Sequence, residues 1–222
     1  MEDFLRVAMT GSDQAGKSVV CRTLLDHFAG AVVVSPEIAT MLTEKGGFPS
    51  VPNMMQWSQE WQDVYQDTIY ATQCGYEKAF ELMARANGAR IMITDRGLLD
   101  GAAYRPEESP ADAVRMFCQL HNTTSEELLK RYAVVIHLET TAMSEPHRFG
   151  KAGNPVRFVG SAETDPKILH EKAVAKALRN DRRLREIYSP HPWYMFIPAS
   201  MGVPGKINEC IGAIRLLLAK KD

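Results

Sequence analysis

Residues 11–18 read GSDQAGKS, and this stretch decides the fold of the chain. It fits a pattern of one glycine, four variable residues, and then glycine, lysine and serine. Residues 4–10, before it, form a short apolar run that is typical of a buried strand. Residues 18–28, after it, place Val20, Leu24 and Phe28 on one face of a helix. The pattern therefore stands between a strand and a helix, which is the context of a phosphate-binding loop.

Each residue type in this phosphate loop (residues 11–18) has a physical task. Glycines let backbone N–H groups turn toward phosphate oxygens, and the following helix directs the positive end of its dipole at the anion. We expect Lys17 to reach the β- and γ-phosphates of ATP, and the Ser18 hydroxyl to bind Mg²⁺. The predicted nucleotide-binding positions are Gly11, Ser12, Asp13, Gln14, Ala15, Gly16, Lys17, Ser18 and Val19.

Four more short apolar runs follow along the chain, separated by helical patterns, at residues 31–35, 90–94, 133–138 and 194–198. Short buried strands that alternate with helices predict an α/β fold with a parallel sheet covered on both faces. We therefore expect three layers in a single domain over residues 1–222. Within it, a helical insertion at about 105–131 and a lid at about 140–165 are predicted.

Several helix boundaries can be predicted from their end residues. The longest helical pattern covers 54–87, and Gly75 is a point where it can divide. Pro110 and Ser125 are expected to begin two short helices in the insertion. Asp165 and Pro166 form a typical start for the helix after the lid, with Asp165 as the N-cap.

Composition excludes several classes of protein. The 222 residues carry 26 basic and 27 acidic side chains, so bulk charge favours neither a nucleic-acid partner nor a membrane anchor. The four cysteines are isolated in sequence, which indicates free thiols in a reducing compartment. The N-terminal stretch opens with acids and lacks a long apolar segment, so we expect no signal peptide and a cytoplasmic protein.

Two carboxylates follow predicted strands, where the ligands of open α/β sheets bind. Asp95 follows the third strand and is placed to assist Mg²⁺, whereas Glu37 follows the second and is a candidate base for an acceptor hydroxyl. Arg96 is expected to contact the transferred phosphate. Simpler interpretations stay open, because Asp95 suits a helix N-cap and Glu37 suits a first helical turn. Asp100 is expected to be a solvated surface acid.

A basic loop follows the fourth strand. Residues 147–157 read HRFGKAGNPVR, and a mobile loop of this kind suits a lid that closes over phosphates through Arg148 and Arg157. The alternative is a solvated surface loop. In the next helix, Arg179 and Arg182 lie three residues apart and can face the nucleotide from one side.

These segments together resemble small P-loop kinases. GSDQAGKS, SPEIAT, ITDRGLLDGAAY and HRFGKAGNPVRF, in this order, resemble the deoxynucleoside and nicotinamide-riboside kinases, and most closely the AAA-domain, NadR-like ATPases. The resemblance implies a sheet order of 2-3-1-4-5 with ATP and Mg²⁺ as donor. It also implies that Lys17, Glu37, Asp95, Arg96, Arg148 and Arg157 act in catalysis, and that Ser18 and Asp95 hold the metal.

Three functions remain in competition. The first is a kinase that transfers the γ-phosphate of ATP to a small nucleoside-like or nucleotide-like acceptor. The second is a hydrolase whose acceptor is water, and the third is a nucleotide sensor that controls a protein partner. A guanine-specifying NKxD motif is missing from the sequence, and Asp95 is followed by arginine rather than by the second acid of oligomeric AAA machines. A homodimer through the 54–87 helix is one further arrangement that the sequence allows.

Overall fold

Five short strands form one sheet in which every neighbouring pair runs parallel. The computed structural model describes residues 4–48, 58–106, 109–150 and 165–219. The strands are β1 (Leu5–Thr10), β2 (Val32–Ser35), β3 (Ile91–Asp95), β4 (Val134–Leu138) and β5 (Tyr194–Ile197). Their order is β2-β3-β1-β4-β5, which confirms the predicted sheet. The phosphate loop therefore leaves the central strand.

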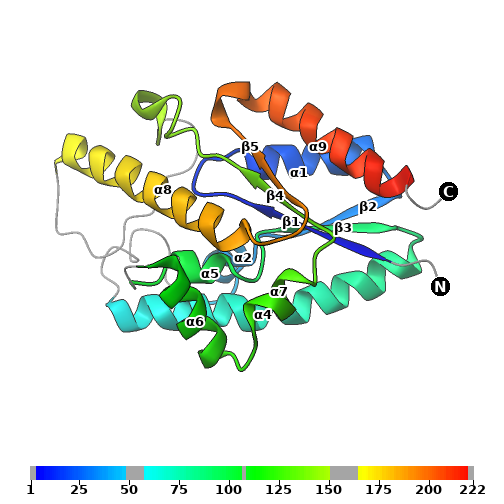
Figure 1. Ribbon diagram of the computed structural model, residues 1–222, viewed down its shortest axis with the longest axis horizontal. Helices are drawn as coiled ribbons and strands as arrows, with labels where there is room; N and C mark the ends of the chain where they lie inside the picture. The colour runs from blue at the N-terminus through cyan, green and yellow to red at the C-terminus, as the bar shows by residue number, and fades with distance from the viewer. Residues whose placement is uncertain (1–3, 49–57, 107–108, 151–164, 220–222) are drawn as a thin grey trace.

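Helices cover both faces of this sheet (Figure 1). They are α1 (Lys17–His27), α2 (Ile38–Glu44), α4 (Gln59–Ala86), α5 (Asp100–Ala103), α6 (Pro110–Leu120), α7 (Ser125–Leu129), α8 (Pro166–Tyr188) and α9 (Gly202–Ala219), with short 3₁₀ turns η1 (Pro146–Arg148) and η2 (Ala199–Met201). One apolar core joins α1 and α9 to the sheet, and a second joins the opposite face to α5, α6, α7 and α8. The three predicted layers are confirmed.

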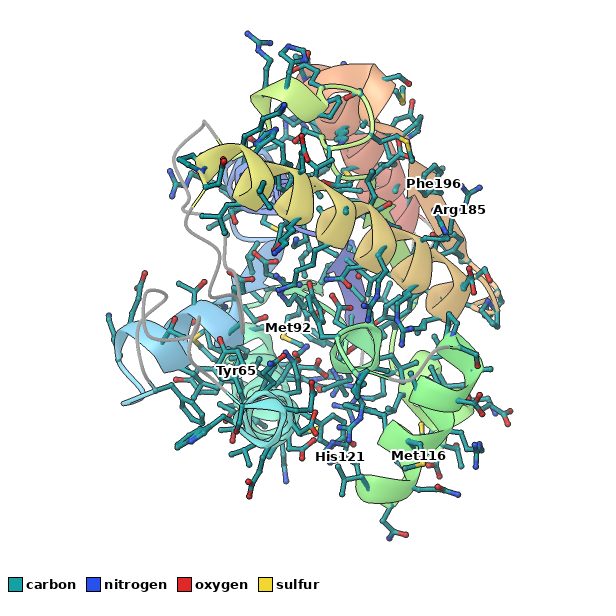
Figure 2. The ribbon with its side chains drawn as sticks, turned by 90° about the vertical axis from the view of Figure 1, so that its left-hand side faces the viewer. Tyr65, Met92, Met116, His121, Arg185 and Phe196 are labelled. Atoms are coloured by element: carbon teal, nitrogen blue, oxygen red, sulfur yellow. The ribbon has the colours of Figure 1, made fainter. Side chains whose placement is uncertain are left out.

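Side chains of the central strands alternate between these two cores, as the pleat of a strand requires. Val7 and Met9 of β1 pack in the core of α1 and α9, whereas Ala8 packs in the opposite one. Near the edge of the sheet, the guanidinium of Arg185 in α8 lies 4.3 Å from the ring centroid of Phe196 in β5 (Figure 2). The layers are thus joined at the edge as well as in the centre.

The helix ends follow the chemistry of their sequences. Ser58 caps α4 through its hydroxyl, which accepts the N–H of Trp61 at 3.2 Å. The helix runs without a break through Gly75, so the expected division there is wrong, and residues 54–57 lie outside the described part of the chain. The helices of the predicted insertion begin at Pro110 and Ser125 as expected, and Asp165 caps α8.

No helix in the described ranges combines the length and the apolar character that a membrane crossing requires.

Candidate functional site

The backbone conformation of the phosphate loop requires glycine at two positions. Gly11 has a φ of +143°, and a Cβ atom built there would lie 2.2 Å from the carbonyl oxygen of Leu138. Gly16, the N-cap of α1, has a φ of +90° in the left-handed region. Both positions therefore need glycine, one because β4 approaches closely and one because of its dihedral angle. The loop continues directly into the N-terminus of α1, with Gly16 as the N-cap.

Lys17 and Ser18 open this helix. The Lys17 ammonium lies back across the loop and donates to the carbonyl oxygens of Gly11 at 2.7 Å and Ser12 at 3.1 Å. Ser18 and Val19 are exposed, and no acidic residue stands in the first turn. The helix dipole and the lysine thus offer positive charge at one place, which is the arrangement an anion needs.

Side chains from distant parts of the chain hold the loop from outside. Lys206 of α9 is buried, and its ammonium donates to the carbonyl oxygen of Ala15 at 2.9 Å and to that of Glu139. Just after β4, the Thr140 hydroxyl donates to the carbonyl oxygen of Asp13 at 2.6 Å, and the Thr141 hydroxyl to that of Gln14 at 3.1 Å. Burial lowers the pKa of Lys206.

Asp181 of α8 binds the same loop through one oxygen. Its Oδ1 lies 3.4 Å from the Ser12 nitrogen, 3.1 Å from the Thr140 nitrogen and 3.3 Å from Nε2 of His137. The other ring nitrogen of His137 lies 2.7 Å from the hydroxyl of Tyr194. Both ring nitrogens of His137 thus lie within hydrogen-bond distance of a polar group, one the Asp181 carboxylate and the other the Tyr194 hydroxyl. His137 is therefore part of a buried polar network that ties α8 to the phosphate loop.

Asp95 ends β3 with a buried carboxyl group. Its side-chain Oδ1 has no hydrogen-bond partner in the described structure, and the residue is 7% exposed. Burial raises the pKa of Asp95 to about 6, against the lowering effect of the Lys17 ammonium. An unpartnered oxygen of this kind fits a cation, and Mg²⁺ uses one or two carboxylates besides phosphate oxygens and water. The described residues hold no cluster of three or more His, Cys, Asp or Glu side chains suited to a metal.

Glu37 and Arg96 form an ion pair beside this carboxyl group. Arg96 Nε and Nη2 each lie 2.8 Å from Oε1 of Glu37, and the Thr40 hydroxyl donates to Oε2 at 2.6 Å. Arg96 Nη1 also donates to the Tyr104 hydroxyl at 2.9 Å. The charges of Lys17, Glu37 and Arg96 all act on Asp95, so the structure brings these four predicted residues together.

The backbone of Arg96 is strained, with a φ of +89°. Its N–H donates to the carbonyl oxygen of Met9 at 3.0 Å, and its carbonyl accepts the side-chain amide of Gln73 at 2.8 Å. Non-glycine residues keep such a conformation only where their surroundings enforce it, and such residues cluster at functional sites.

Asp100 is buried, so the expectation of a solvated surface acid is wrong. Its carboxylate accepts the Thr10 hydroxyl at 2.9 Å, the Tyr188 hydroxyl at 2.8 Å and the Gly97 N–H at 3.1 Å. These bonds link the end of β1 to the turn that carries Arg96. Asp100 is therefore one of the residues that shape the site.

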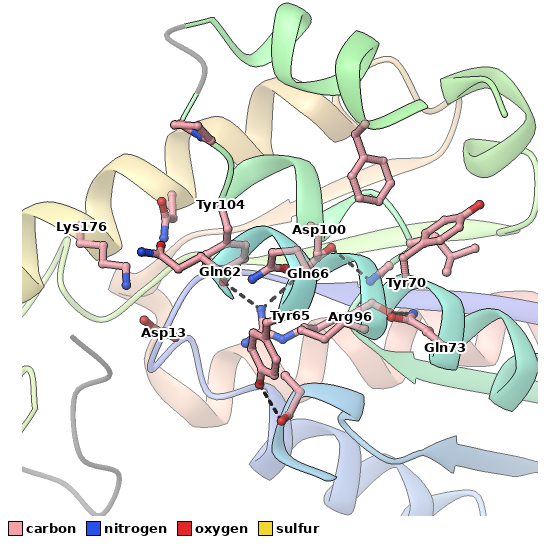
Figure 3. Close-up of a pocket in the computed structure, with 18 of the residues that line it drawn as sticks. Asp13, Gln62, Tyr65, Gln66, Tyr70, Gln73, Arg96, Asp100, Tyr104 and Lys176 are labelled. Atoms are coloured by element: carbon pink, nitrogen blue, oxygen red, sulfur yellow. Dashed lines mark hydrogen bonds and ion pairs between the residues drawn. The ribbon is translucent and has the colours of Figure 1, made fainter. Parts of the chain in front are cut away.

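A cavity of about 360 Å³ opens beside the ion pair (Figure 3). Asp13 of the phosphate loop and Arg96 both line it. The wall of α4 is rich in carboxamide and aromatic side chains, and α8 supplies two cations and an amide; together these residues are Gln59, Gln62, Tyr65, Gln66, Tyr70, Gln73, Lys176, Arg179 and Asn180. The cavity is large enough for a small metabolite.

Among the basic residues predicted to act in the lid, Arg148 is the one that the structure describes, and it is not drawn into this cluster. The side chain of Arg148 is 69% exposed and pairs with Glu145 at 3.1 Å, and Arg157 lies outside the described residues. Gly150 adds to the contacts that Thr140 and Thr141 make with the phosphate loop, because its N–H donates to Oε1 of Gln14 at 3.0 Å. In α8, both Arg179 and Arg182 are exposed, but only Arg179 is among the residues that line the cavity.

Comparison with known proteins agrees with this geometry. The model of the AAA domain family matches residues 6–197. A search of curated proteins finds no significant match. Among solved structures, deoxyadenosine kinase from M. mycoides with bound dATP is similar, with a TM-score of 0.60 at 14% identity over 95% of this chain and 99% of that one. The same kinase with bound dCTP gives a TM-score of 0.51 at the same identity and coverage. The chain therefore belongs to the AAA domain family and has the fold of P-loop kinase-like nucleoside triphosphatases.

Proposed function

We propose that the protein is a phosphotransferase that moves the γ-phosphate of ATP to a hydroxyl of a small, nucleoside-like or nucleotide-like acceptor. The observation that carries this proposal is the shared lining of the cavity. Asp13 joins it to the phosphate loop, and Arg96 joins it to the ion pair with Glu37. A hydrolase needs room only for water, whereas this cavity of about 360 Å³ has space for an organic acceptor.

The phosphate loop binds the donor in this proposal. Backbone N–H groups of residues 13–18 and the Lys17 ammonium surround the phosphates, and Ser18 with Asp95 holds Mg²⁺. The metal ion neutralises charge on the phosphates when bound. Lys17 donates to the carbonyl oxygens of Gly11 and Ser12, so its charge is held at the loop.

Glu37 is the proposed base. It takes the proton of the acceptor hydroxyl as that oxygen bonds to the γ-phosphorus, and the bond from phosphorus to the bridging oxygen of ADP breaks. Arg96 orients the carboxylate through its two N–H groups. The similarity to deoxyadenosine kinase with bound dATP and dCTP supports a nucleotide as a ligand of this fold.

The remaining roles follow the sequence. Residues 140–165 are proposed as a lid that brings Arg148 and Arg157 over the phosphates, and residues 105–131 as an insertion within a single domain. A cytoplasmic location, ATP with Mg²⁺ as cofactors and a homodimer through α4 belong to the same proposal, and neither nucleic acid nor membrane is expected as a partner.

The test is ATP turnover by the purified protein with Mg²⁺, alone and with a panel of nucleosides, nucleotides and other hydroxylated metabolites. Lys17→Ala is the blank. One compound that raises ADP release and gains a phosphate supports the kinase. Steady ADP release that ignores the panel shows a hydrolase instead, and binding of ATP without turnover favours the sensor.

A further inference from the structure

One amide in the cavity wall is left without a partner. Asn180 of α8 is 3% exposed and lines the cavity. Its Nδ2 has no hydrogen-bond partner in the described part of the chain. A buried N–H group without a partner costs free energy, and native structures rarely keep one without a reason. A ligand that enters the cavity can supply the missing acceptor.

The backbone at Asn180 is fixed beside the phosphate loop. The next residue, Asp181, accepts the N–H of Ser12 at 3.4 Å, so Asn180 and Asp13 flank one direct contact between α8 and the loop. Arg183 lies one turn further on, and its Nη2 is 3.5 Å from the carbonyl oxygens of Ala102 and Arg105. Asn180 is therefore held where α8 contacts the phosphate loop, beside the cavity that both line.

The hydrogen-bonding groups that line the cavity here determine which ligand groups fit. The Nδ2 group donates hydrogen bonds, whereas the carboxylate of Asp13, which lines the same cavity, only accepts them. A hydroxyl group satisfies both because it accepts one bond and donates another.

We propose that Asn180 donates a hydrogen bond to a second hydroxyl of the acceptor, close to the hydroxyl that receives the phosphate. This inference rests on the proposed function and deepens it by naming the substrate class. The acceptor carries neighbouring hydroxyl groups, as a ribose or another vicinal diol does. A matched compound without the second hydroxyl leaves Asn180 unpartnered and binds more weakly.

The experiment compares matched acceptors, a ribonucleoside and its 2′-deoxy counterpart, with wild type and Asn180→Leu. The substitution keeps most of the side-chain volume and removes the donor. Binding to the ADP- and Mg²⁺-loaded protein is measured by calorimetry, so the result does not depend on turnover. Wild type is expected to prefer the ribonucleoside by about tenfold, and the variant to lose this preference while it binds the deoxynucleoside unchanged.

Controls separate this role from a structural one. Gln119→Leu removes an exposed carboxamide from α6 and should keep the preference. A melting temperature of Asn180→Leu at or above that of wild type is expected, because an unpartnered polar group is lost. Equal binding of both compounds to wild type, binding of neither, or equal weakening of both by Asn180→Leu overturns the inference. If the protein phosphorylates an acceptor but shows no preference for the second hydroxyl, the kinase function stands and the role of Asn180 is refuted. If Asn180→Leu loses the preference but no compound is phosphorylated, the role of Asn180 stands and the kinase function is refuted.

Discussion

Arg96 holds the Glu37 carboxylate through two N–H groups on one oxygen, each at 2.8 Å. The other oxygen accepts the Thr40 hydroxyl at 2.6 Å, so the carboxylate has a fixed orientation. A base must be oriented before it can take a proton from a bound hydroxyl in one step. The ion pair is therefore a prepared element of the site as well as a contact between α2 and the end of β3.

Glu37→Gln tests the proposed base. The amide keeps the shape of the side chain but cannot take a proton, so transfer should fall about 10²- to 10⁴-fold. The Kd for ATP should change by less than about threefold, since the proposed role of Glu37 is to act on the acceptor hydroxyl rather than on the phosphates of ATP. Turnover and calorimetry measure the two effects. Glu44→Gln, an exposed site at the end of α2, is the control, and full transfer by the Glu37 variant would remove its role as base.

Asp95→Asn should separate stability from metal binding. The pKa of the buried carboxyl group is raised to about 6 from its ordinary value of 3.8. Between these values the folded state holds the proton more tightly than the unfolded state, so stability falls as pH rises from about 4 to 6. The uncharged amide removes this penalty. Without Mg²⁺ or nucleotide, the melting temperature of the variant should exceed that of wild type by roughly a few degrees at pH 7.5. The difference in melting temperature should be smaller at pH 4.5.

The same variant should lose Mg²⁺-dependent affinity for ATP, because the carboxylate oxygen that fits the cation is gone. Titration of ATP with and without Mg²⁺ measures this loss. Asp26→Asn, an exposed position in α1, should show neither effect. An Asp95 variant that binds Mg²⁺ and ATP as wild type does would remove Asp95 from the metal site.

Gly11→Ala should destabilise the fold strongly. The new Cβ would meet the carbonyl oxygen of Leu138 at 2.2 Å, and backbone atoms on both strands would have to move. We expect a loss of about 3 kcal/mol or more in the free energy of unfolding, measured with urea. Gly75→Ala is the matched control, since no heavy atom lies within 4 Å of its added Cβ in α4. That variant should gain about 0.5–1 kcal/mol, and equal effects at both sites would contradict the close approach.

Asp181→Ala should weaken both the fold and the binding of ATP. It leaves the N–H groups of Ser12 and Thr140 and the ring of His137 without their shared acceptor. We expect a loss of about 2–4 kcal/mol in stability and of roughly fivefold or more in ATP affinity. Asp181→Asn keeps one acceptor oxygen and should lie between wild type and the alanine variant.

The exposed acid Glu186, also in α8, supplies the control. Glu186→Ala should leave the unfolding free energy within about 0.5 kcal/mol of wild type. If Asp181→Ala loses stability but binds ATP as tightly as wild type, the network supports the fold without shaping the phosphate loop.

The sheet and the loop could be predicted because local sequence specifies them. The strands are short β-branched or apolar runs, and residues 11–18 carry their own dihedral requirements at Gly11 and Gly16. The starts of α6 at Pro110 and of α8 after Asp165 could be predicted for the same reason, because a capping residue acts on the first turn of the helix that follows it. The expected break at Gly75 is wrong because packing of the 28-residue helix outweighs the small cost of one glycine.

The supports of the site could not be predicted in this way. Lys206 and Asp181 lie 191 and 169 residues from the loop atoms that they bind, and neither stands in a motif. Asp100 looked like a surface acid because its partners Thr10 and Tyr188 come from opposite ends of the chain. Only the folded arrangement brings these side chains together, and this dependence on tertiary packing explains why local patterns pass over them.

The left-handed backbone at Arg96 has a consequence for laboratory evolution. A glycine would adopt a φ of +89° without strain, but it would remove the guanidinium that holds Glu37 and Tyr104. The fold therefore stores about 1–3 kcal/mol at this one position. Loss of the guanidinium would leave the largely buried Glu37 carboxylate without this partner, at a cost of about 3–5 kcal/mol. Because this cost exceeds the backbone strain, a selection for heat resistance alone should keep arginine at position 96.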